Sequence, residues 1–420
     1  MNRFSYTLLY YLLLPVVFFR LLLRSRNAPL YRQRWAERLG FFKAPDQING
    51  LWVHAVSVGE TIAAAPLIKQ IQRCFPDLPI TITTMTPTGS ERVRAMFGDS
   101  VFHVYVPYDT PGAVKRFLHR VQPRLALVME TELWPNLVHC CSHQNIPVLI
   151  ANARLSERSA RGYQRFAKLT GDMLDKVAVI AAQTEDDGRR FISLGLDSKK
   201  LHITGSVKFD IQVTDELLLA GQKLRQQWGE RPVMIAASTH QGEDEQVLEA
   251  FTDVLKQHPT ALLVLVPRHP ERFVAVEGVG REQGYSCVLR SKAEPVLAST
   301  QVLLADTMGE MMLLFAASDV AFVGGSLVPC GGHNYLEPAV LAMPILSGPH
   351  VFNFSEISDM LTTAGGMQIV DNAQALAQQA NQWFEQPLLC QQVGQSARAV
   401  VEANRGAQQR LFELVEKYLN

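Results

Sequence analysis

The sequence lacks the common patterns of metal and disulfide sites. Its six cysteines include no C-x-x-C spacing, and the chain has neither an H-E-x-x-H motif nor a D-x-D motif. His139 and His143 stand four residues apart on an expected helix, but without the intervening glutamate of a zinc motif we interpret them as ordinary helix histidines. We therefore expect a reducing compartment, no disulfide framework and no tightly bound metal.

The sequence also has no net charge. The 40 Lys and Arg residues balance 40 Asp and Glu residues, which argues against a general nucleic-acid-binding protein. The balance is locally uneven, because six arginines crowd one short region with Glu37 as the only acid: Arg20, Arg24, Arg26, Arg32, Arg34 and Arg38.

An apolar run precedes and overlaps these arginines. Residues 6–19 are almost wholly apolar, and no small-residue cleavage site follows them, which argues against a removed signal peptide. The length is borderline, so a short membrane span and a helix lying in the membrane interface both remain open. Arginines after such a helix hold the following chain on the cytoplasmic side and attract anionic lipid. We predict a membrane anchor in residues 1–30.

The remainder is long enough for two domains. Short apolar runs alternate with amphipathic stretches, which predicts parallel, doubly wound α/β sheets of the Rossmann type. Expected strands are 51–56, 80–84, 101–106, 124–129, 147–151, 177–182 and 202–205, then 233–237, 262–266, 286–289, 302–305 and 320–323. We expect one domain at 31–208 and another at 209–400, with a ligand cleft between them. Late helices are expected at 373–384 and 397–418, and whether residues 401–420 cross back to the first domain stays open.

Residues 319–354 form the most informative stretch. A strand at 320–323 ends at Gly324-Gly325, and a second glycine pair, Gly331-Gly332, precedes Asn334 and an apolar segment at 336–343. This pattern predicts a strand, a loop and a helix capped by Asn334. Backbone N–H groups at glycines and at a helix start favour an anion site, and Glu337 would reach a sugar hydroxyl. Each residue alone suits an ordinary turn, whereas the cluster favours a phosphate or sugar-nucleotide site.

Three candidate groups lie in the first half. Glu60 follows the strand 51–56 and is equally well explained as a general base or as a first-turn helix acid. Glu130 and Glu132 follow the strand 124–129, where they would orient an acceptor or support positive charge on a sugar; alternatively, Thr131 caps a helix over 132–143. Lys208, at the domain junction, is either a partner for a leaving phosphate or a hinge lysine.

In the second half, polar side chains again follow strands. Arg268 would clamp a phosphate with His269 beside it, and backbone amides near Gly309 would hold a nucleotide. Singly these are ordinary loops, but their convergence with Ser238 and the glycine-rich stretch on one sheet edge favours a ligand site.

Eight motifs in this order resemble the 3-deoxy-D-manno-octulosonic acid (Kdo) transferase family. They are SVGE (57–60), MTPTGSER (85–92), METELWPN (129–136), ANARLS (151–156), TGSVKFD (204–210), VPRHPERF (266–273), DTMGE (306–310) and FVGGSLV with GGHN and a following glutamate (322–337). The resemblance implies a GT-B glycosyltransferase fold and an inverting, metal-independent reaction without a cofactor. It also implies CMP-Kdo as donor, a lipid A precursor (lipid IVA) as acceptor, and the cytoplasmic face of a Gram-negative inner membrane.

Matched residue by residue, the resemblance implies Glu60 as catalytic base and Glu130 and Lys208 as stabilisers of the transition state. The CMP-binding residues it implies are Arg268, His269, Met308, Gly309, Glu310, Met311, Asn334, Tyr335, Leu336 and Glu337. Tyr335 departs from the proline of the family pattern, and Pro329-Cys330 from more polar residues.

Two alternative functions remain. One is a GT-B transferase that uses a UDP-sugar and another lipid acceptor. The other is a non-catalytic, membrane-anchored sensor of sugar nucleotides, against which Glu60 and Glu130 at neighbouring strand ends argue.

Overall fold

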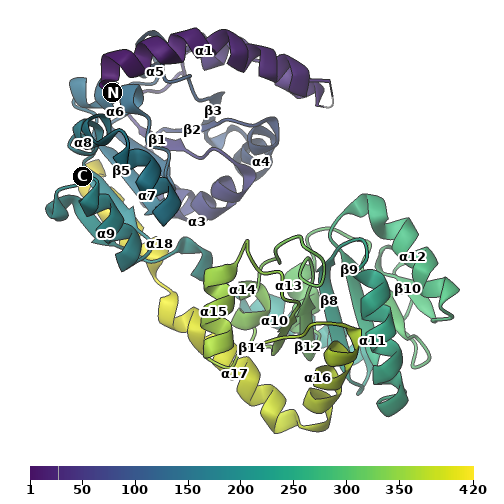
Figure 1. Cartoon of the computed structure of the whole chain (residues 1–420). Helices are drawn as coiled ribbons and strands as arrows, with labels where there is room; N and C mark the ends of the chain where they lie inside the picture. Colours follow the sequence, from purple (N-terminus) through teal and green to yellow (C-terminus); the bar gives the residue numbers. More distant parts are fainter. Residues whose placement is uncertain (27) are drawn as a thin grey trace. The chain divides into compact units, whose positions relative to one another are not determined.

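The computed structural model describes residues 1–26 and 28–420, and the chain divides into two compact units. The first unit comprises Met1–Asp210 with Arg405–Asn420, and the second comprises Ile211–Asn404 (Figure 1). Each unit is built on a seven-stranded parallel sheet that has a hydrophobic core on both faces. The predicted doubly wound α/β organisation is confirmed.

The first sheet has the strand order β3-β2-β1-β4-β5-β6-β7. All seven expected strands are present, at β1 (Leu51–His54), β2 (Ile80–Thr84), β3 (Phe102–Tyr105), β4 (Leu125–Met129), β5 (Val148–Ala153), β6 (Val179–Ala182) and β7 (Leu201–Ile203). From β1 the chain adds β2 and β3 on one side of β1, and it then returns to add β4 on the other side of β1. Ligands of such sheets bind at the carboxyl ends of the two strands that flank this reversal, here β1 and β4.

Helices cover both faces of this sheet. They are α2 (Trp35–Arg38), α3 (Val58–Cys74), α4 (Pro87–Phe97), α5 (Pro111–Val121), α6 (Pro135–His143), α7 (Glu157–Gln164), α8 (Ala167–Leu174) and α9 (Glu185–Ser193). The prediction that α6 begins at Glu132 is wrong. Pro135 occupies the first helical position, where its fixed backbone and missing N–H are tolerated, and residues 130–134 form a loop.

The second sheet has the order β10-β11-β9-β8-β12-β13-β14. Its strands are β8 (Val233–Thr239), β9 (Leu262–Pro267), β10 (Cys287–Leu289), β11 (Val302–Leu304), β12 (Val320–Val323), β13 (Ile345–Ser347) and β14 (Met367–Ile369). The last two are absent from the sequence prediction, because runs of only three residues carry little periodicity. Here the reversal lies between β8 and β12.

The helices of this unit are α10 (Asp215–Trp228), α11 (Asp244–Gln257), α12 (Phe273–Glu282), α13 (Met311–Ala316), α14 (Leu336–Val340), α15 (Ser355–Thr363), α16 (Ala373–Glu385) and α17 (Pro387–Asn404). The single helix expected over 397–418 is wrong. The chain instead breaks at Gly406, whose φ of 94° favours glycine, and continues as α18 (Ala407–Leu419).

Helix α18 completes the first unit. Leu411 and Val415 belong to the same buried cluster as Ile68 of α3. Asp210 accepts hydrogen bonds from the N–H groups of Gly406 (2.6 Å) and Gln408 (2.6 Å), which fixes the start of α18 beside the end of the first unit's main segment.

The N-terminal helix α1 (Arg3–Arg24) packs along the first unit through one of its faces. Near its start, the Thr7 hydroxyl donates to Asn136 Oδ1 (3.0 Å), and the Tyr6 hydroxyl bonds to the buried Asp109. Near its end, Phe18 contacts the ring of Tyr108 and Leu21 is buried. The opposite face is apolar and exposed along its whole length, through Phe4, Leu8, Leu12, Val16, Phe19 and Leu23.

Candidate active site

Glu60 is buried at the carboxyl end of β1. Its Oε2 accepts the N–H of Val56 (2.8 Å), and its Oε1 accepts the hydroxyl of Ser57 (2.9 Å). Ser57 in turn caps α3 by accepting the N–H of Glu60 (3.4 Å), so S-V-G-E forms a variant of the capping box. The side chain therefore has a structural role and a fixed position at the same time.

The surroundings of Glu60 set its proton affinity. Glu60 is 7% exposed. Burial raises its pKa to about 7, against the lowering effect of the hydrogen bonds from Val56 and Ser57, and the negative charges of Glu130 and Glu132 raise it further. A carboxylate with this pKa is half ionised near neutral pH, as a general base requires.

The loop after β4 brings two further carboxylates to this edge. Glu130 has a φ of 57°, an uncommon conformation for a residue with a side chain, and its N–H donates to Ala151 in β5 (2.8 Å). Glu132 accepts from Trp134 Nε1 (2.8 Å), and burial raises the pKa of Glu132. Thr131 is not a helix cap, since its hydroxyl bonds to the backbone of Arg154.

The segment that contains Lys208 is tied to the same edge. Lys208 is an exposed residue of the 3₁₀ turn Val207–Phe209. The N–H of Val207 donates to Asn152 Oδ1 (3.2 Å), and Asn152 directly follows the residue that receives the N–H of Glu130. The structure thus places Glu60, Glu130 and the backbone of the Lys208 segment at neighbouring strand ends.

Sequence reasoning gave Asn152 no role. It is fully buried at a φ of 54°, and within the described chain its Nδ2 has no hydrogen-bond partner. In the sequence, Asn152 stands between two alanines of an otherwise apolar strand. A buried strand rarely contains a polar residue unless that residue makes a specific contact, so the asparagine was the available signal.

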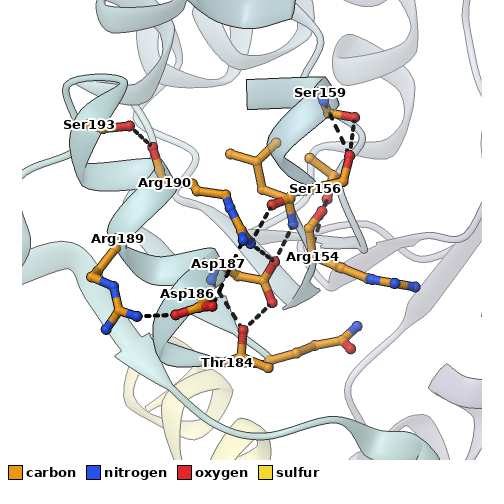
Figure 2. A network of polar contacts seen from close by, with 12 residues as sticks. Arg154, Ser156, Ser159, Thr184, Asp186, Asp187, Arg189, Arg190 and Ser193 are labelled. Atoms are coloured by element: carbon orange, nitrogen blue, oxygen red, sulfur yellow. Dashed lines mark hydrogen bonds and ion pairs between the residues drawn. The ribbon is translucent and has the colours of Figure 1, made fainter. Parts of the chain in front are cut away.

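A polar network fixes the backbone at Leu155, next to Arg154 (Figure 2). The buried Asp187 accepts the N–H of Leu155 (2.7 Å) and the hydroxyl of Thr184 (2.6 Å), and Arg190 donates to the carbonyl of Leu155 (3.1 Å). The Arg154 side chain extends away from this network and has no ion pair among the described residues. An exposed cation therefore stands beside the Glu130 loop.

The second unit contains a cavity of about 360 Å³ at the carboxyl ends of β8, β9 and β12. Its volume suits part of a nucleotide. It is lined by Ala237, Ser238, Arg268, Met311, Phe315, Val323, His333, Asn334, Glu337 and Phe354. Four residues of the predicted nucleotide site, Arg268, Met311, Asn334 and Glu337, are therefore brought together here.

Asn334 and Glu337 form a unit within this cavity. Asn334 Nδ2 donates to Glu337 Oε1 (3.1 Å), and Asn334 Oδ1 accepts the N–H of Leu336 at the start of α14 (3.2 Å). Burial raises the pKa of Glu337, while the hydrogen bond from Asn334 and the charge of Arg268 lower it. The prediction that Asn334 is the N-cap is wrong, because Tyr335 occupies that position without a side-chain cap bond, and α14 ends at Val340 rather than near Met343.

The other predicted nucleotide residues are placed differently. Tyr335 is fully buried and its hydroxyl bonds to Ser347 (2.8 Å), and Leu336 belongs to the core. Met308 is exposed, and Glu310 pairs with Arg290 (2.8 Å), which lowers the pKa of Glu310. The residues that line the cavity include none of these four, nor His269 or Gly309.

One part of the predicted anion site is wrong. The buried carboxylate of Glu243 accepts the N–H groups of Gly325 (2.6 Å), Ser326 (2.9 Å) and Leu327 (2.8 Å), as well as that of His240 (3.0 Å). The amides that follow Gly324 therefore already bind an anion, the Glu243 carboxylate of the protein itself. They hold the loop in shape and are not available to a phosphate.

His333 closes the cavity wall beside this loop. Its Nε2 lies 2.8 Å from Nε2 of His240, and the two rings are stacked. Burial lowers the pKa of His333 to about 4, and the nearby His240 and Arg268 act in the same direction. His333 is therefore neutral at physiological pH and presents no charge to a ligand.

Comparison with known proteins identifies the family. Residues 33–211 match the family described as 3-deoxy-D-manno-octulosonic-acid transferase (kdotransferase). The chain is 47% identical to the 3-deoxy-D-manno-octulosonic acid transferase of Haemophilus influenzae, over 100% of this chain and 99% of that protein. It is 35% identical to the protein of the same name from Bordetella pertussis, over the whole of both chains.

A solved structure supports the fold. UDP-GlcNAc 2-epimerase from Neisseria meningitidis superposes with a TM-score of 0.58 at 17% identity, over 88% of this chain and 100% of that one. Paired Rossmann-like units of this kind make up the GT-B fold. The chain therefore belongs to the 3-deoxy-D-manno-octulosonic acid transferase family of glycosyltransferases.

Proposed function

We propose that the protein transfers Kdo from CMP-Kdo to the lipid A precursor, lipid IVA, with inversion at the anomeric carbon. The observation that supports this most strongly is Glu60, a buried carboxylate with a pKa of about 7 at the reversal point of the first sheet. The second unit supplies the complementary part, a cavity of nucleotide dimensions that contains Arg268, Asn334 and Glu337.

In the proposed reaction, Glu60 removes the proton from the acceptor hydroxyl while that oxygen attacks the anomeric carbon of Kdo. The bond between this carbon and the phosphate oxygen breaks, and CMP leaves with the bonding electron pair. Arg268 and Lys208 offset the charge on the leaving phosphate, and the carboxylate of Glu130 supports the cationic sugar centre. CMP has one phosphate, so these cations suffice without a metal ion.

Product analysis tests the proposal directly. Purified full-length protein, CMP-Kdo and lipid IVA are expected to yield a lipid product whose mass has increased by one or more Kdo residues. Absence of any product with both substrates bound would favour the sensor alternative.

Competition between nucleotides tests the donor. We expect CMP to displace a labelled CMP ligand at least tenfold more effectively than UDP, because the cavity has one arginine in its lining and suits a monophosphate. The displacement curve for CMP is expected to be the same with and without a chelator. Tighter binding of UDP, or a requirement for a divalent cation, would favour the UDP-sugar alternative.

We further propose that α1 lies in the interface of the inner membrane on its cytoplasmic face. With 22 residues, helix α1 is long and apolar enough to cross a membrane. However, one face of α1 contacts the first unit from Thr7 to Leu21, so a docked α1 cannot leave that unit to cross a bilayer. The exposed apolar face suits insertion among lipid chains, and the exposed Arg20, Arg24, Arg26 and Arg32 suit anionic headgroups. The other two arginines of the cluster serve the fold, because Arg38 is buried and Arg34 pairs with Glu37.

Labelling from either side of the membrane tests this placement. An Asn2→Cys variant, with the exposed Cys74 and Cys330 replaced by serine, is treated with a membrane-impermeant maleimide. We expect labelling in inside-out vesicles only, because an interfacial helix keeps both of its ends on the cytoplasmic side. A cysteine introduced at the exposed Leu219 serves as the control for the cytoplasmic side. Labelling of the Asn2→Cys variant in right-side-out vesicles would contradict the proposal and establish a span.

A further inference from the structure

Glu243 is a fully buried carboxylate that the transfer mechanism does not use. It occupies the N-cap position of α11, yet its side chain makes no cap hydrogen bond to that helix. An ordinary N-cap side chain accepts an N–H of the first helical turn. The carboxylate of Glu243 instead binds the loop after β12, 82 to 84 positions along the chain, so helix capping does not account for it.

Both oxygens of this carboxylate are fully used. Oε1 accepts the N–H groups of Ser326 (2.9 Å) and Leu327 (2.8 Å). Oε2 accepts the N–H groups of Gly325 (2.6 Å) and His240 (3.0 Å). Four N–H donors around one side chain require a group that only accepts, which is the ionised form of a glutamate. The loop is therefore organised around an anion that the protein supplies.

Gly325 connects these contacts to the donor cavity. Its carbonyl accepts the N–H of Gly332 (2.8 Å), which closes the loop immediately before His333 and Asn334. Gly325 has a φ of 70°, and a Cβ atom added there would lie 3.0 Å from the ring of His333. Because His333 and Asn334 both line the cavity, the carboxylate acts on the cavity wall through a single glycine.

His240 provides a second connection to the same wall. Its N–H donates to Glu243, and its Nε2 lies 2.8 Å from Nε2 of His333. His240 directly follows β8, whereas His333 belongs to the loop after β12. One carboxylate therefore fixes both members of the histidine pair, and its loss would release both at once.

We propose that Glu243 is a positioning residue of the donor site. Its carboxylate holds the loop 324–334 in the conformation that presents Asn334, together with the bonded Glu337, to the donor. Glu243 does not line the cavity and acts only through this loop. The role rests on the donor site of the proposed function.

Glu243→Gln tests the role with the least change of shape. Glutamine keeps one acceptor oxygen, and its NH₂ group then faces two of the four N–H donors. We expect the Kd for CMP and the KM for CMP-Kdo to rise about tenfold. We expect kcat at saturating donor to stay within about twofold of the wild type, because no reacting group is changed. A variant that was merely less stable would lose kcat and keep its KM.

Hydrogen exchange examines the loop without any ligand. We expect the amides of 325–327 to exchange at least about tenfold faster in Glu243→Gln, at times at which β9 remains protected. Glu245→Gln removes an exposed acid from the first turn of the same helix, and this matched control is expected to have no effect. Failure of the wild type to bind CMP would overturn the donor site, whereas the exchange rates would still decide whether Glu243 holds the loop.

A double-variant cycle tests the route from Glu243 to the ligand. If Glu243 acts through Asn334, Glu243→Gln changes the Kd for CMP much less in an Asn334→Ala background than in the wild type. The same fold-change in both backgrounds would contradict this route.

Glu243→Ala tests the anion itself. Acetate has the atoms that this substitution removes beyond Cβ, and we expect it to restore both the Kd for CMP and the slow exchange of the loop. Acetamide has the same shape without the charge and is expected to restore neither. Equal effects of acetate and acetamide would overturn the role of the charge. Wild-type affinity for CMP in Glu243→Gln would overturn the proposal, and this variant decides alone if Glu243→Ala does not fold.

Discussion

Replacement of Glu60 by glutamine is expected to lower kcat for Kdo transfer by about 10²–10⁴-fold, the usual contribution of a general base. Glutamine has nearly the same shape and can still accept the N–H of Val56, but it cannot take up the acceptor proton. The Kd for CMP is expected to stay unchanged, because the proposed nucleotide cavity lies in the second unit. The measurement is single-turnover transfer alongside CMP titration of the same preparation.

Folding of the variant is a natural concern, because Glu60 also belongs to the cap of α3. Burial holds the folded-state pKa of Glu60 at about 7, above the ordinary value of 4.5. Ionisation therefore disfavours the folded state increasingly as pH rises above the unfolded-state value, and the full effect is reached above pH 7. Glutamine has no charge and therefore avoids this destabilisation of the folded state, so the variant is expected to unfold no more easily than the wild type at pH 8. Glu185→Gln, at an exposed first-turn acid of α9, is the matched control and is expected to retain full activity.

The pH profile gives a second test of the same role. The carboxylate form is the base, so kcat/KM is expected to rise with an apparent pKa of about 7 and to level off above it. Glu130 and Glu132 are the charged neighbours that raise the pKa of Glu60, so Glu132→Gln is expected to move the rise to lower pH. Persistence of the same rise in Glu60→Gln at a comparable rate would assign the base to another group.

The sequence predicted the strand ends well, because buried parallel strands have continuous apolar runs that stop at polar residues. β2 and β12 begin and end where the apolar pattern predicted, and Glu60, Glu130 and Arg268 follow strands as expected. Physical reasoning from strand ends therefore located both candidate sites. It did not choose between the two interpretations of Glu60, since the capping contacts and the raised pKa occur together in the structure.

The parts that could not be predicted depend on contacts between residues distant in the sequence. Glu243 is an ordinary acid near a helix start in the sequence, and only the fold brings the amides of Gly325, Ser326 and Leu327 to it from more than 80 positions away. The first glycine pair was therefore correctly interpreted as part of a shaped loop but wrongly as a free anion site. Asn152 is similar, because its partner Val207 lies 55 positions along the chain.

Removal of Arg268 is expected to weaken CMP binding by about 10–100-fold, the usual effect of losing a charged hydrogen-bond donor. The N–H of Arg268 donates to the carbonyl of Thr239 (3.0 Å), which fixes its backbone at the cavity. Its charge acts on both Glu337 and His333, and no ion pair holds its guanidinium within the described residues. Isothermal titration of CMP into wild-type protein, Arg268→Ala and Arg268→Lys measures the effect, and Arg268→Lys is expected to be intermediate because lysine keeps the charge without the two-pronged geometry.

The kinetic effect of Arg268→Ala distinguishes binding from catalysis. An arginine that only holds the ground-state phosphate changes the KM for CMP-Kdo and leaves kcat at saturating donor unchanged. The charge on the phosphate increases as the bond to the anomeric carbon breaks, so an arginine that contacts the leaving oxygen lowers kcat as well. We expect both parameters to worsen, with Arg281→Ala, at an exposed ion pair of α12, as the unaffected control. An unchanged Kd for CMP in Arg268→Ala would remove the residue from the phosphate site and leave Asn334 and Glu337 as the groups that define the cavity.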